Sequence, residues 1–163
     1  TKTAGAMADR RGAVTILPPL PGSSPQDGPG WEAVWSEALS RVARGAEAVV
    51  LGVAGRDEVP AHDRAVDALV ASRLACPWEA INDVALAHLG AFGGGPGVLI
   101  LSGTGSMAWA RGPAGEARVG GWGDVIGDEG SAHWIGREAL ARAAQALDGR
   151  GPGDLPFARA LCG

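Results

Sequence analysis

Short apolar strands that alternate with helical segments between residues 48 and 101 constrain the fold more than any other feature. Residues 48–53 are rich in valine and end at Ala54 and Gly55, which are typical of a turn. The predicted order is strand 48–53, helix 66–74, a short strand around residues 80–81, helix 83–91 and strand 98–101. This alternation predicts an α/β fold with helices packed on a sheet, and in such folds ligands gather at the carboxyl ends of the strands.

The flanking segments add a hairpin and two helices. The N-terminal hairpin is predicted from strands 3–8 and 13–17 and a turn at residues 9–12. Residues 18–30 are rich in proline and glycine and are expected to form a surface loop. Trp31 and Trp35 begin an amphipathic helix that ends near Gly45, and we expect both indoles in the core. The last predicted helix has one apolar face, formed by Ala132, Ile135, Ala139, Ala143 and Leu147.

The composition excludes several function classes. Lys2 is the only lysine, and 14 basic against 18 acidic side chains give a net charge of −4, without a basic stripe for nucleic acid. Cys76 and Cys162 lie far apart without the spacing of zinc ligands, so we predict neither a zinc site nor a disulfide framework, no protein metal ligands and two buried thiols. No apolar run approaches the roughly 20 residues that cross a bilayer, and no secretory signal begins the chain, so we expect a cytoplasmic protein.

The first motif with chemical content is the apolar strand at residues 97–101, which ends in Ser102-Gly103-Thr104-Gly105-Ser106. Glycines allow close approach of a ligand, successive N–H groups can surround an anion, and hydroxyl groups can donate to phosphate oxygens. The segment therefore fits a phosphate-binding loop without a Walker lysine. An ordinary hairpin turn leading into residues 107–110 explains the same residues, so a second feature must decide between a phosphate-binding loop and a simple turn.

That second feature is the glycine-rich segment of residues 120–131, which precedes the last helix. Asp128 and Glu129 could simply be acids that complement the dipole of this helix. The glycines need another reason, because each costs backbone entropy, and a loop that passes close to a bound ligand supplies one.

The third feature is Asp83, which lies at the predicted junction of a strand and a helix. In phosphoryl transfer to an alcohol, a fixed carboxylate accepts the proton of the substrate hydroxyl. A lone aspartate at this position could equally be a helix N-cap.

Taken together, residues 81–87, 99–106 and 120–140 resemble the BadF/BadG/BcrA/BcrD ATPase family, and especially its N-acetylglucosamine kinases. The resemblance implies an actin-like ATPase (ribonuclease H-like) fold, with an N-terminal lobe in residues 1–95 and the beginning of a C-terminal lobe in residues 96–163. It also implies ATP and Mg²⁺ as cofactors, a sugar as substrate and a homodimer. The expected reaction is transfer of phosphate from ATP to the 6-hydroxyl of an amino sugar such as N-acetylglucosamine or glucosamine.

The resemblance assigns a role to each matching residue. Asp83 would be the catalytic base, and Gly103, Thr104, Gly105 and Ser106 would hold the ATP phosphates, with Thr1 as the remnant of a first phosphate motif. Sugar contacts would come from Asp128, Trp122, Gly121 and Met107.

Two departures from the family pattern bear on this expectation. Met107 stands where the sugar kinases have a sugar-contacting asparagine, which leaves glucosamine and other hexoses open. The aspartate and glycines of the first phosphate motif do not precede Thr1, and the later adenosine motif is missing, so we expect a fragment truncated at both ends. Two alternatives therefore stand beside the kinase: an ATPase that activates a radical dehydratase or reductase, and a non-catalytic sugar- or nucleotide-binding fragment.

Overall fold

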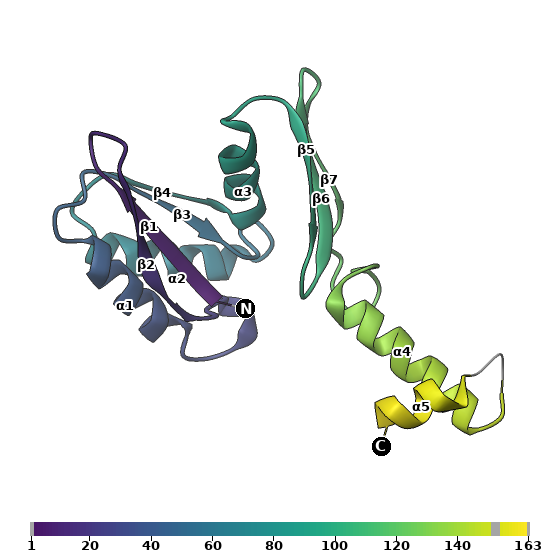
Figure 1. Ribbon diagram of the computed structural model, residues 1–163. Coiled ribbons are helices and arrows are strands. Elements are labelled where there is room, and N and C mark those ends of the chain that lie inside the picture. The colour runs from purple at the N-terminus through teal and green to yellow at the C-terminus, as the bar shows by residue number, and fades with distance from the viewer. Residues whose placement is uncertain (1, 151–153, 163) are drawn as a thin grey trace. The chain divides into compact units, whose positions relative to one another are not determined.

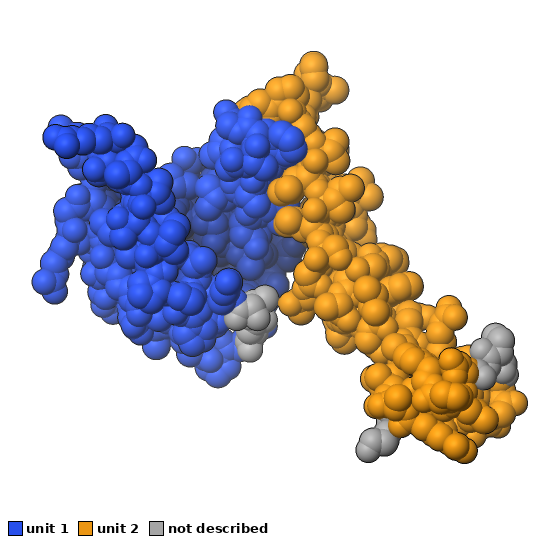
Figure 2. Space-filling model, viewed as in Figure 1, with its two compact units in different colours: residues 1–93 blue, residues 94–163 orange. Residues whose placement is uncertain are grey.

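The computed structural model describes residues 2–150 and 154–162, and contacts divide the chain into two compact units, residues 1–93 and 94–163 (Figure 2). Each unit combines strands with helices, which confirms the α/β class. The described strands form separate sheets of two, two and three strands instead of the single sheet that the sequence pattern indicated. The assignment of residues 1–95 and 96–163 to two actin-like lobes stays a prediction.

The first unit begins with an antiparallel hairpin of β1 (Lys2–Ala8) and β2 (Val14–Pro21). The Asp9 carboxylate closes the turn by accepting hydrogen bonds from the backbone N–H groups of Arg11 and Ala13. β2 continues through Pro18 and Pro19 to Pro21, so the loop begins later than the predicted residues 18–30. Proline is tolerated here because a two-stranded sheet consists only of edge strands, where some N–H groups have no partner to lose.

The centre of the first unit is a parallel strand pair with its crossover helix. β3 (Val49–Val53) pairs with β4 (Trp78–Asn82), and α2 (Pro60–Arg73) connects them. α1 (Trp31–Val42) contacts α2 (Figure 1). The core between these elements consists of Trp35, Leu39, Val53, Val66, Val70 and Leu74, with Trp31 packed against it as predicted. Cys76 also packs here, although it is only half-buried.

Helix α3 (Asp83–Phe92) packs against β3 on the face that points away from this core. Val49, Leu51 and Val53 contribute to the core, so strand alternation places Val50 and Gly52 on the opposite face. A methyl group on Gly52 would lie 2.8 Å from Cδ2 of Leu86 and 3.2 Å from the Cα of Asp83. Glycine is therefore required for the close approach of the two elements.

The second unit opens with an antiparallel meander of β5 (Gly97–Ser102), β6 (Ser106–Gly112) and β7 (Gly115–Gly120). Helix α4 (Ala132–Leu147) follows, and the shorter α5 (Leu155–Cys162) packs on it through Ala143, Ala146 and Ala158. The sequence patterns indicated α4 but neither β7 nor α5. Among the described residues, no helix is long and apolar enough to span a membrane.

Candidate functional site

The loop between β5 and β6 is a tight hairpin turn with two unused backbone donors. Ser102 and Ser106 are paired across the hairpin, and the N–H of Gly103 donates to the carbonyl of Gly105 at 2.9 Å. Within the described part of the chain, the N–H groups of Thr104 and Gly105 donate to no protein acceptor. The segment is thus a hairpin turn, as one interpretation of its sequence held, and it also offers adjacent N–H groups to an anion.

Hydrogen bonds attach this loop to the segment that precedes α4. The hydroxyl of Ser102 donates to the carbonyl of Gly130 at 2.9 Å, and the N–H of Ala132 donates to the carbonyl of Gly103 at 2.8 Å. The hydroxyl of Ser106 donates to the carbonyl of Glu129 at 2.8 Å. A serine has one hydroxyl proton, so in this arrangement Ser106 contributes acceptor lone pairs and not the donor that its sequence position indicated.

The side chain of Asp128 forms a further contact between the two glycine-rich segments. Its half-buried carboxylate accepts a hydrogen bond from the N–H of Ser106 at 3.3 Å. A methyl group on Gly105 would lie 2.8 Å from Oδ2 of Asp128, which explains a glycine at this position. Asp128 has a φ of 59°, in the left-handed region that aspartate tolerates better than most residues.

Gly121, Met107 and Trp122 lie at the junction of β7 with the second glycine-rich segment. The N–H of Gly121 donates to the carbonyl of Ser106 at 3.0 Å, and a methyl group on Gly121 would lie 3.3 Å from Cβ of Met107. The side chain of Trp122 is 75% exposed. Gly121 and Met107 therefore lie next to Ser106 at the end of the β5–β6 loop, and the sugar contacts of Gly121, Met107 and Trp122 stay predictions.

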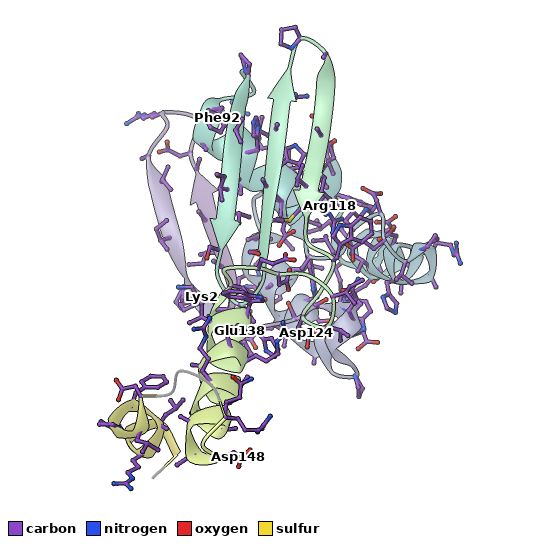
Figure 3. The ribbon with its side chains drawn as sticks, turned by 90° about the vertical axis from the view of Figure 1, so that its right-hand side faces the viewer. Lys2, Phe92, Arg118, Asp124, Glu138 and Asp148 are labelled. Carbon is purple, nitrogen blue, oxygen red and sulfur yellow. The ribbon has the colours of Figure 1, made fainter. Side chains whose placement is uncertain are left out.

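Arg118 is a residue at this junction that the sequence reasoning missed. It lies on β7, and its guanidinium donates to the carbonyl of Gly121 at 2.6 Å (Figure 3). Further along the segment, Arg137 of α4 donates to the carbonyl of Asp124 at 3.0 Å. Two arginines thus hold the backbone on either side of Trp122. A single arginine close before the glycine run is the only trace of this contact in the sequence.

Asp83 lies in the first unit, at the carboxyl end of β4. Asn82, not Asp83, is the N-cap of α3: its side-chain oxygen accepts from the N–H of Val84 at 2.9 Å. Asp83 is the first helical residue, is exposed, and also accepts from the same N–H at 3.0 Å. The capping interpretation therefore applies to its neighbour, and the carboxylate of Asp83 keeps acceptor capacity for a ligand.

The segment after β3 is held beside Asn82. The carbonyl of Arg56 accepts a hydrogen bond from the Asn82 amide at 3.3 Å. The Arg56 guanidinium forms a bidentate pair with Asp67, at 2.6 and 3.1 Å, and this hydrogen bonding raises the pKa of Arg56 above its ordinary value. The side chain of Gln26 donates to Glu58 at 3.0 Å, which brings residues 18–30 against the same segment. The carboxyl end of β4 and the segment after β3 thus lie side by side.

The cofactor expectations differ in how well the described residues fit them. A phosphate fits the donors of Thr104 and Gly105, whereas Thr1 lies outside the described residues. Among the residues that the structure describes, no group of three or more acidic, histidine or cysteine side chains converges to form a metal cage. Mg²⁺ usually keeps several waters and binds one or two carboxylates together with substrate phosphates, so it does not need such a cage.

Comparisons with known proteins point to one family of ATPases. The model of the BadF/BadG/BcrA/BcrD ATPase family matches residues 22–153. An N-acetylmuramic acid/N-acetylglucosamine kinase from Clostridium acetobutylicum is 34% identical over 119 residues, which are 71% of this chain and 39% of that protein. A second relative is a Chromobacterium violaceum protein of known crystal structure, provisionally named an N-acetylglucosamine kinase, which is 29% identical in sequence. The two structures superpose with a TM-score of 0.67 over 91% of this chain and 57% of the Chromobacterium chain. The chain thus spans well under two thirds of either relative, and it belongs to the BadF/BadG/BcrA/BcrD ATPase family.

Proposed function

We propose that this protein is a sugar kinase that transfers the γ-phosphoryl group of ATP to the 6-hydroxyl of an amino sugar, N-acetylglucosamine or glucosamine. The observation that carries the proposal is the contact between the β5–β6 loop and Asp128, because it places free backbone donors and an acceptor carboxylate side by side. Family membership and the names of both relatives support it. The proposal includes an actin-like fold, a cytoplasmic location and a homodimer.

In the proposed reaction, Asp83 accepts the proton of the sugar 6-hydroxyl while the sugar oxygen attacks the γ-phosphorus. The bond between the γ-phosphorus and the bridging oxygen breaks, and ADP leaves with the electron pair. The N–H groups of Thr104 and Gly105 stabilise phosphate charge, together with the Thr104 hydroxyl. Bound Mg²⁺ would neutralise phosphate charge.

In this proposal the second glycine-rich segment, residues 120–131, orients the sugar substrate. Asp128 accepts hydrogen bonds from sugar hydroxyls, while Trp122, Gly121 and Met107 shape the sugar pocket. Met107 cannot offer the amide hydrogen bonds of an asparagine, so the sugar is bound with fewer polar contacts at this position.

The decisive experiment measures ADP release with ATP, Mg²⁺ and a panel of N-acetylglucosamine, N-acetylmuramic acid, glucosamine and glucose. We expect Asp83→Asn to lower kcat by about 10²–10⁴-fold, the usual contribution of a positioned general base, with little change in KM. Glu79→Gln is the matched control, because it removes an exposed carboxylate from β4 of the same unit. A folded Asp83→Asn variant with unchanged turnover would contradict the assignment of the base.

The radical-enzyme activator is not favoured, because both relatives are named as sugar kinases. A non-catalytic binder predicts sugar binding without ADP release, and the same panel distinguishes it from the kinase.

A further inference from the structure

Asp128 places a negative charge beside the donors that the proposed function assigns to phosphate. Oδ1 lies 3.3 Å from the N–H nitrogen of Ser106, and Oδ2 would lie 2.8 Å from a methyl group on Gly105. The adjacent N–H groups of Thr104 and Gly105 have no protein acceptor among the described residues. The carboxylate thus lies directly beside the donors that the proposed function assigns to phosphate.

A phosphate that approaches this loop meets a like charge at short range. The repulsion between two anions is strong at a few ångströms in a half-buried environment, where water screens it only partly. Nucleotide binding is therefore weakened for as long as the carboxylate keeps this position.

The backbone of Asp128 is fixed, whereas its side chain can rotate. The carbonyl of Asp128 accepts a hydrogen bond from the N–H of Ser131 at 3.0 Å. The carbonyls of the two following residues, Glu129 and Gly130, accept from the hydroxyls of Ser106 and Ser102, respectively. The carboxylate itself is held by one long hydrogen bond from the loop. A change of side-chain rotamer therefore breaks this one hydrogen bond and moves the charge, while the other hydrogen bonds between the two segments stay in place.

We propose that Asp128 is a positioning residue that the sugar and the phosphate loop share, so that sugar binding strengthens nucleotide binding. Sugar hydroxyls that donate to the carboxylate draw it away from Gly105 and offset its charge, which leaves the loop donors to the phosphate. By linkage, the nucleotide strengthens sugar binding by the same factor. The inference rests on the proposed function, since it needs both ligands in this unit.

Calorimetry on the full chain tests the inference without turnover. The dissociation constant of the non-hydrolysable analogue AMP-PNP is measured with and without N-acetylglucosamine, with N-acetylmuramic acid as the second sugar probe. We expect a sugar to tighten AMP-PNP binding by about tenfold in the wild type, within the usual range of coupling. Asp128→Asn keeps the left-handed backbone and an oxygen acceptor for Ser106 but removes the charge. This variant should bind AMP-PNP more tightly than the wild type without sugar, and the effect of sugar should shrink to less than about twofold.

The control variant is Glu116→Gln, which removes the same charge from β7 at the end of the hairpin opposite Ser106. It should keep the wild-type coupling, and a thermal melt should show that both variants are folded. If both ligands bind but do so independently, or if Asp128→Asn keeps the full coupling, the inference is wrong and the kinase proposal stands. If the wild type binds neither ligand, both fail.

Discussion

At the scale of single residues, the surroundings of a side chain decide its role more than its type does. Ser106 and Thr104 look equivalent in the sequence, yet the Ser106 hydroxyl donates to Glu129 while Thr104 remains exposed. The capping role that the sequence allowed for Asp83 is likewise filled by its neighbour Asn82. The sequence identified the right segments, but hydrogen bonds across 22 to 28 residues decided which atoms stay available to a ligand.

Two ion pairs of equal length allow a direct test of burial. Arg56 and Asp67 approach to 2.6 Å with side-chain exposures of 15% and 38%, whereas Arg10 and Glu47 approach to 2.6 Å with exposures of 86% and 70%. Arg56→Ala should lower the free energy of unfolding by about 1–2 kcal/mol, because it leaves a partly buried carboxylate without its charged donors. Arg10→Ala should change it by less than about 0.5 kcal/mol. Urea denaturation measures the free energy of unfolding of both variants. Equal decreases would show that burial does not make the Arg56–Asp67 pair more stabilising than the Arg10–Glu47 pair.

At the scale of elements, apolar periodicity located most helices and strands, because burial of one face imposes a period of 3.6 or 2. α1, β3 and β4 lie close to where the pattern placed them, since their apolar side chains contribute to the core. The pattern also located α2, but this helix begins at Pro60, six residues before the predicted segment. The extension of β2 through Pro21, and also β7, could not be read in this way, because pairing with a neighbouring strand and not burial defines them. β7 is exposed along nearly its whole length, so it carries no apolar alternation.

The packing of β3 against α3 gives a prediction about how Asp83 is positioned. Gly52→Ala should destabilise the protein by about 1–3 kcal/mol, because the new methyl group overlaps the Leu86 side chain and crowds the Asp83 backbone. Displacement of that backbone should also lower kcat. Gly90→Ala is the matched control on α3, because a methyl group there would lie more than 4 Å from any atom other than the neighbouring helix backbone. This substitution should stabilise the helix by about 0.5–1 kcal/mol. Thermal melts and ADP release measure the two effects, and a Gly52→Ala variant with wild-type stability would contradict the close approach.

At the scale of the whole molecule, the two units differ in the core that each one buries. The first has one core of apolar side chains from α1, α2, β3 and β4. The buried core of the second, within its described residues, consists of three alanines from α4 and α5. Its sheet leaves Ile100 and Val119 at 75% and 71% exposure. Hydrophobic burial is the main driving force of folding, so stability should be distributed unequally between the units.

This difference predicts how the units behave when they are separated. Residues 1–93 expressed alone should unfold cooperatively on heating, because a small domain that buries a tryptophan, two leucines and three valines in one core can offset its chain entropy. Residues 94–163 alone should lose circular dichroism gradually, since no residue of the three strands β5 to β7 is fully buried and such a sheet is only marginally stable. In the intact chain, amide exchange should be slowest in β3, β4 and α2 and faster in β5 to β7. A sigmoidal melt of residues 94–163, or the reverse order of exchange, would mean that the second unit gains its stability from contacts other than its alanine core.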